Sequence, residues 1–290
     1  MEWMFRKQMK QKAKDLLSGI WGRAVALLLA LAAVSVFCSL LERTVVSLTG
    51  LSTLEQLFSP LLLYGSVTIS MRPLLFAIGL FVGSLFLSFL FGTPLRQGSV
   101  SWYYGRASGE IYPVSKAFSW YASLKRWLKV LVVYFLLFLK TTLWTVLFLL
   151  PAAAVYFAYC ISAIYQAAAW QSFLLFVLSA GLVLGGLIVS LIVCYRYFLV
   201  PYILADDPRV RVRTLFRSSV SIMEGKKAEF FALDLSFLPY YILNLLIVPM
   251  LGTMPYINMT KALYAKRYIL NYQLDVLVKK REAAEQNIEI

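Results

Sequence analysis

Long stretches of this chain contain almost no charged residues, and they constrain the fold more than any other feature. Residues 74–91, for example, contain no Asp, Glu, Lys or Arg. A helix needs about 20 mostly apolar residues to cross roughly 30 Å of hydrocarbon, and only helices and closed barrels satisfy their backbone hydrogen bonds there. Because 61% of the 290 residues are hydrophobic and only 14% are charged, we predict an all-α, polytopic membrane helix bundle.

The apolar runs divide the chain into about six predicted spans. Residues 1–23 are expected to form an amphipathic basic helix on the cytoplasmic side, lying in the headgroup plane. Residues 24–270 then form the membrane domain, and residues 271–290 form a charged cytoplasmic tail. The predicted spans are 24–41, 74–91, 130–150, 173–199, 230–248 and 253–270.

The segments between spans carry turn and interface signals. Residues 92–94 (Gly-Thr-Pro) are predicted to stop the second span, and Pro151 to end or kink the third. Residues 92–129 mix basic and aromatic side chains, so a loop at the membrane interface is expected there. Residues 42–73 are interpreted as an external loop with a membrane-hugging part.

The placement of positive charge predicts the orientation. The formal net charge is +14, and six spans would put 23 of the 28 basic residues on one side. Cytoplasmic loops of membrane proteins carry such an excess, so both termini are predicted to lie in the cytoplasm. Hydropathy alone does not decide whether residues 253–270 cross, but a five-span arrangement would place the basic C-terminal end outside.

Two segments combine an apolar face with basic residues at helical spacing, the N-terminal helix and a predicted helix over residues 208–224. We predict that their cations contact anionic lipid headgroups, although they could instead only orient the chain during insertion and then face water. Nucleic acid is not expected as a partner, because the basic residues lie between membrane spans. The candidate lipid contacts are Lys7, Lys10, Lys14, Arg209, Arg213 and Arg217.

Charged residues also fall within predicted spans, and three of them suggest specific contacts. Arg196 and Asp234 lie at similar depth near the cytoplasmic ends of spans four and five, so we predict that they form an ion pair. Lys140 lies in the middle of span three. Its two open interpretations are a polar element of a pathway and a lysine that snorkels or packs against backbone carbonyls.

The sequence contains no recognisable catalytic motif. The chain has no histidine, its three cysteines are widely separated, and no phosphate-binding loop or nucleophile motif is found. We therefore predict no cofactor, no metal and no enzymatic activity.

Two functions then compete. The first is a non-enzymatic membrane component, either a scaffold or an accessory subunit with a possible protein partner in the membrane. The second is a small transporter or lipid-handling permease, suggested by the broken segment around Pro239, Pro249, Gly252 and Pro255.

The most distinctive local sequence begins near residue 197 with YFLVPYILADDP, SSVSIMEGKK, FFALDLSFLPYYILNLL and MPYINMTKALY. In order and spacing these blocks resemble the domain-of-unknown-function 975 family of bacterial integral membrane proteins, as do GTPLRQGSVSWYYGRASGE and the opening FRKQMKQKAKDLLSGIW. Ala152 after Pro151, and Pro239-Tyr240, depart from that family's usual glycines. The resemblance implies a bacterial cytoplasmic membrane and no particular activity. A fainter likeness links the final span and basic tail to the membrane domain of some glycerophosphodiester phosphodiesterases.

Overall fold

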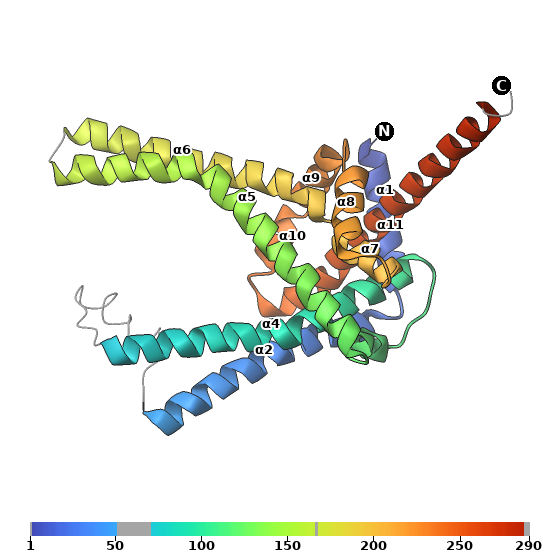
Figure 1. Cartoon of the computed structure of the whole chain (residues 1–290), viewed down its shortest axis with the longest axis horizontal. Helices are drawn as coiled ribbons and strands as arrows, with labels where there is room; N and C mark the ends of the chain where they lie inside the picture. The colour runs from blue at the N-terminus through green and yellow to red at the C-terminus, as the bar shows by residue number, and fades with distance from the viewer. Residues whose placement is uncertain (1, 51–70, 166–167, 287–290) are drawn as a thin grey trace.

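The computed structural model describes residues 2–50, 71–165 and 168–286 (Figure 1). These residues form helices and no strand, which confirms the all-α prediction. Two long helical hairpins extend in the same general direction from a compact body. One hairpin pairs α2 (Trp21–Thr49) with α4 (Met71–Ala107), and the other pairs α5 (Leu124–Ile164) with α6 (Ala169–Cys194).

The body is built from the shorter helices and the near ends of the hairpins. Its core includes the fully buried side chains of Leu17, Phe230 and Met259, which come from three separate helices. The remaining elements are α1 (Glu2–Leu17), η1 (Val114–Trp120), η2 (Tyr195–Tyr197), α7 (Val200–Asp206), α8 (Val212–Ile222), α9 (Lys227–Leu235), α10 (Leu238–Leu243) and α11 (Ile247–Gln286).

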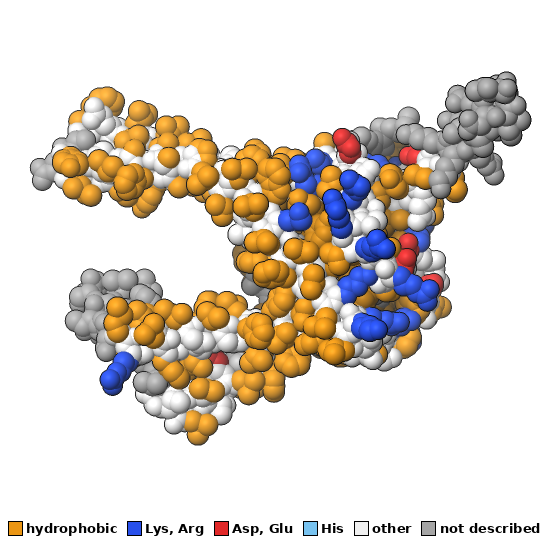
Figure 2. Space-filling model, viewed as in Figure 1, with side chains coloured by type: hydrophobic (Ala, Val, Ile, Leu, Met, Phe, Trp, Pro, Cys, Tyr) orange, Lys and Arg blue, Asp and Glu red, His pale blue; other side chains and the backbone are white. Residues whose placement is uncertain are grey.

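Within the described residues, four helical stretches are long and apolar enough to cross a membrane. Their outer side chains are exposed, for instance Leu143 at 67% and Leu184 at 64%, and Figure 2 shows hydrophobic side chains along both hairpins while Lys and Arg gather on the body. These stretches cover most of the first four predicted spans, but the predicted number of about six is not confirmed. They are Trp21–Thr49, Met71–Ala107, Leu124–Ile164 and Ala169–Asp206.

The fifth predicted span falls in a broken segment, whereas the sixth, residues 253–270, lies within the continuous helix α11, which is not one of these four stretches. Helices α9 and α10 have nine and six residues, each too short to cross the hydrocarbon at about 1.5 Å per residue. The turn from α10 to α11 points the same way as the hairpins but stops well short of their far ends (Figure 1). Its side chains are apolar and open, with Leu245 exposed by 83% and Ile247 by 80%.

The predicted helix stop at residues 92–94 is wrong, because α4 continues through Pro94 to Ala107. Proline lacks the N–H that would bond to the carbonyl oxygen four residues earlier, and here that oxygen belongs to Leu90. The Trp127 indole Nε1 donates to it at 3.3 Å, and the Tyr121 hydroxyl donates to the next carbonyl oxygen, of Phe91. Aromatic residues from the predicted interfacial loop therefore satisfy the backbone where the proline interrupts it.

Helix ends elsewhere also differ from the sequence-based boundaries. Helix α2 extends to Thr49, so the predicted external loop begins later, and its apolar stretch within residues 51–70 lies outside the described residues. Helix α5 does not end at Pro151 but continues to Ile164, and Figure 1 shows that it changes direction along its length. This agrees with a kink rather than a stop.

The amphipathic helices use much of their apolar faces inside the protein. In α1, Ala13 and Leu17 are fully buried, and the helix packs against α11. In α8, Leu215 is fully buried and Phe216 is only 7% exposed. An amphipathic pattern predicts a buried apolar stripe but not its partner. Here part of each stripe packs within the protein, and the basic faces remain open.

Candidate functional site

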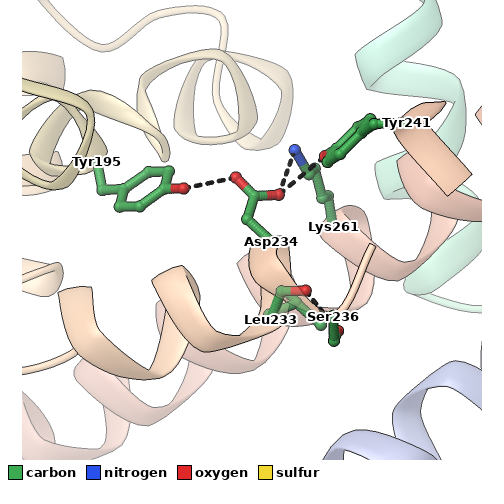
Figure 3. Close-up of polar contacts among 6 residues, drawn as sticks. All are labelled: Tyr195, Leu233, Asp234, Ser236, Tyr241 and Lys261. Atoms are coloured by element: carbon green, nitrogen blue, oxygen red, sulfur yellow. Dashed lines mark hydrogen bonds and ion pairs between the residues drawn. The ribbon is translucent and has the colours of Figure 1, made fainter. Parts of the chain in front are cut away.

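A polar cluster around Asp234 combines side chains from η2, α9, α10 and α11 (Figure 3). The Asp234 carboxylate forms an ion pair with Lys261, whose Nζ lies 2.8 Å from Oδ1. The Tyr195 hydroxyl donates to Oδ2 at 2.7 Å, and the Tyr241 hydroxyl donates to Oδ1 at 3.0 Å. The carboxylate thus accepts from three donors, an arrangement that suits a structural lock more than a proton-transfer group.

The predicted partner of Asp234 is therefore incorrect. Among the described residues, Arg196 is in no ion pair, and the neighbouring Tyr195 reaches Asp234 in its place. Consecutive residues on a helix point roughly 100° apart, so an argument from depth alone does not choose between positions 195 and 196. Lys261 was assigned to a span whose crossing hydropathy left undecided, and no sequence signal placed it beside Asp234.

Arg196 and Lys140 instead lie against aromatic rings at the root of the α5–α6 hairpin. The Arg196 guanidinium carbon is 4.8 Å from the centre of the Trp144 ring, and Lys140 Nζ is 5.6 Å from the centre of the Phe216 ring. The Arg196 Nε atom is buried and has no hydrogen-bond partner within the described part of the chain. Ring contacts stabilise cations but do not neutralise them, so this root keeps two uncompensated positive charges.

The three predicted lipid-contact arginines, Arg209, Arg213 and Arg217, are all exposed and are called the arginine face below. Only Arg213 and Arg217 lie on α8, because the helix begins at Val212 rather than near residue 208. Arg209 lies in the preceding turn, where its backbone N–H donates to Asp207 Oδ1 at 2.8 Å. This Asx-type bond competes with helix formation. None of the three side chains has an ion-pair partner in residues 2–50, 71–165 and 168–286.

The three N-terminal lysines lie on one side of α1 but differ in exposure. Lys7 and Lys14 are exposed, with Lys14 Nζ 5.5 Å from the centre of the Tyr256 ring. Lys10 is half-buried, lies 4.2 Å from the centre of the Phe237 ring and donates to the carbonyl oxygen of Ser236 at 3.2 Å. Burial, and then the nearby charges of Arg6 and Lys14, lower the pKa of Lys10. This face of α1 is therefore crowded with positive charge.

Sequence and structure comparisons identify the family but not an activity. The model of a family described as a protein of unknown function, DUF975, matches residues 4–271. No curated protein and no solved structure matches the chain, so the fainter likeness to a phosphodiesterase membrane domain has no support. Since the match covers nearly the whole chain, this protein belongs to the DUF975 family.

Proposed function

We propose that this protein is a non-enzymatic component of a bacterial cytoplasmic membrane, a scaffold or accessory subunit, that binds anionic phospholipid headgroups. The observation that carries the proposal is the arginine face. Its side chains project from α8 and the turn before it, and the other side of α8 is anchored in the body by Leu215 and Phe216. No carboxylate among the described residues pairs with them. A rigid, uncompensated basic surface at the root of apolar hairpins suits an anionic leaflet.

The neighbouring cations support the same partner. Phe216 of α8 lies under Lys140, so the unpaired charges at the α5–α6 root adjoin the helix that bears the arginine face. Cations inside membrane proteins usually pair with carboxylates or backbone carbonyls. Phosphate groups of the inner leaflet would supply the missing negative charge, because Lys and Arg side chains extend toward headgroups near helix ends.

Removing part of the arginine face tests the proposal. We expect Arg213→Gln with Arg217→Gln to lower the preference for anionic over neutral lipid by up to roughly 30-fold, since each cation contributes about 1 kcal/mol near an anionic leaflet before salt screening. The measurement is the lipid content of protein extracted in mild detergent, compared by mass spectrometry. Adding Arg209→Gln tests whether the turn contributes as well.

The matched control removes two arginines from the α2–α4 hairpin. Arg43 and Arg72 are exposed near the ends of α2 and α4 that point away from the body, so Arg43→Gln with Arg72→Gln has the same change in net charge. The control is expected to keep its anionic lipid. Equal lipid content in both double variants and the unchanged protein would leave orientation during insertion as the only role of the arginine face.

A permease is the second candidate, because the segment from α9 to α11 is broken and carries the Asp234–Lys261 pair. Discontinuous helices with charged groups line the binding sites of several transporters. Purification from native membrane followed by mass spectrometry separates the two functions. A stoichiometric protein partner supports the scaffold, and a retained solute supports the permease.

The proposed orientation places the body and both termini in the cytoplasm, and the short α10–α11 turn within the bilayer. We expect a cysteine at Leu245, in a variant lacking the three native cysteines, to resist a membrane-impermeant thiol reagent added from outside. Tyr165→Cys, at the exposed tip of the α5–α6 hairpin, is expected to react. A C-terminal alkaline phosphatase fusion should be inactive. Labelling of Leu245→Cys as strong as that of Tyr165→Cys would restore six spans.

A further inference from the structure

A cavity of about 580 Å³ opens between the end of α1, the start of α2, α10 and α11. Its volume falls within the usual range for small-ligand pockets. Trp21, the first residue of α2, lies on its wall. Because α2 is a candidate span and Trp favours the headgroup level of a bilayer, the proposed orientation puts the cavity at the membrane surface on the body side.

The polar lining offers mainly donors. Lys14 contributes an ammonium group, and Ser18, Tyr240 and Tyr256 contribute hydroxyls. None of these three hydroxyls has a hydrogen-bond partner elsewhere in the described structure. Asp15 is the one carboxylate in the lining, and it accepts a hydrogen bond from Gln11.

Positive side chains on α1, beside the cavity, favour an anionic ligand over a cationic one. Arg6, Lys10 and Lys14 follow one another at four-residue spacing on α1 and so share a face. Their mutual repulsion contributes to the lowered pKa of Lys10, which an anion nearby would relieve. A cationic ligand such as a quaternary ammonium group would need aromatic faces, but Lys10 and Lys14 already lie over Phe237 and Tyr256.

Apolar surface is also part of the cavity itself. Its wall includes the side chain of Trp21 and the rings of Tyr240 and Tyr256. The apolar part of a ligand could lie against these rings while its charged group lies beside Lys14. A ligand with one charged end and one apolar end therefore fits the site better than a fully polar one.

We infer that this cavity is a specific site for a phosphate ester, with the phosphate held by Lys14 and the Ser18 and Tyr240 hydroxyls, and with a donor group on the ligand directed to Asp15. The same chemistry is offered by a phospholipid headgroup and by a free phosphate ester. The inference rests on the proposed lipid-binding function but assigns it a separate set of residues, distant in sequence from the arginine face.

The test compares Lys14→Gln with Lys12→Gln in the full chain. Lys12 is exposed on the same helix but does not line the cavity, so the control has the same change of charge. Native mass spectrometry after extraction in mild detergent is expected to show one retained phospholipid per chain in the unchanged protein and in Lys12→Gln. Retention should fall roughly tenfold or more in Lys14→Gln, because a charge-assisted hydrogen bond is lost, and Tyr240→Phe should reduce it further.

The remaining outcomes separate this site from the arginine face. If Lys14→Gln keeps its lipid while Arg213→Gln with Arg217→Gln loses anionic lipid, the cavity is not the site and the proposed function stands. If only Lys14→Gln loses lipid, the site stands and the arginine face does not bind. Equilibrium dialysis with inorganic phosphate distinguishes the source of the ligand. Phosphate binding that depends on Lys14, without retained lipid, assigns the site to a free phosphate ester. The absence of both retained lipid and phosphate binding would overturn the site.

Discussion

Replacement of Lys261 by methionine is expected to lower the free energy of unfolding by about 3–5 kcal/mol, because it leaves a mostly buried carboxylate without its cation. The two side chains of the pair are only 22% and 17% exposed. Methionine keeps the length and apolar stem of lysine, so the change isolates the charge. The hydroxyls of Tyr195 and Tyr241 still donate to Asp234. The loss of unfolding free energy is therefore expected to be smaller than for a buried carboxylate without any hydrogen-bond donor. Unfolding of the full chain in mild detergent measures it.

A second substitution decides whether the loss belongs to the ion pair. Lys261→Met combined with Asp234→Asn removes both charges, and replacement of a whole buried pair is often neutral, so most of the stability should return. Arg196→Gln serves as the control for the pair predicted from sequence and should show no coupling with Asp234→Asn. A loss under about 1 kcal/mol for Lys261→Met, or strong coupling to Arg196, would contradict the arrangement in Figure 3.

Hydropathy predicted the helical class and the first four spans, because those helices expose their apolar side chains on most sides. Its fifth and sixth spans are not confirmed: the fifth is interrupted between α9 and α10, and the sixth contains side chains that are buried in the protein. Residues 253–270 contain buried side chains such as Tyr256, Met259 and Tyr268, which pack within the body rather than against lipid. A composition average does not distinguish these two environments.

The features that the sequence did not predict depend on contacts between segments that are distant in the chain. Pro94 is a strong local stop signal, yet Trp127 donates to the carbonyl oxygen that the proline leaves free, and nothing within the residues around Pro94 indicates that donor. The roles of Lys261 and Tyr195 likewise depend on how three helices rotate about their axes. Local propensity is a prior that tertiary packing overrides.

Gly98→Ala is expected to destabilise the protein by about 1–3 kcal/mol or more, the cost of overpacking a tight contact. A Cβ at position 98 of α4 would lie 1.8 Å from the carbonyl oxygen of Ala117 in η1 and 2.5 Å from its carbonyl carbon. Both atoms belong to the backbone, so no side-chain rotation relieves the clash and η1 must move. Thermal unfolding in mild detergent, read by fluorescence, measures the change.

The same substitution elsewhere in the same helix provides the control. A Cβ on Gly83 would meet nothing within 4 Å, so Gly83→Ala should be neutral or stabilising by roughly 0.5–1 kcal/mol through helix propensity. Equal unfolding midpoints for Gly83→Ala and Gly98→Ala would refute the close contact between α4 and η1.

The contact between α4 and η1 matters for the whole body, because it adjoins the fully buried side chain of Gln97. Gln97 donates to the Pro201 carbonyl oxygen at 2.8 Å and accepts from the Tyr134 hydroxyl at 3.2 Å. A shift of η1 against α4 would therefore also strain the junction of α4, α5 and α7, from which both hairpins extend.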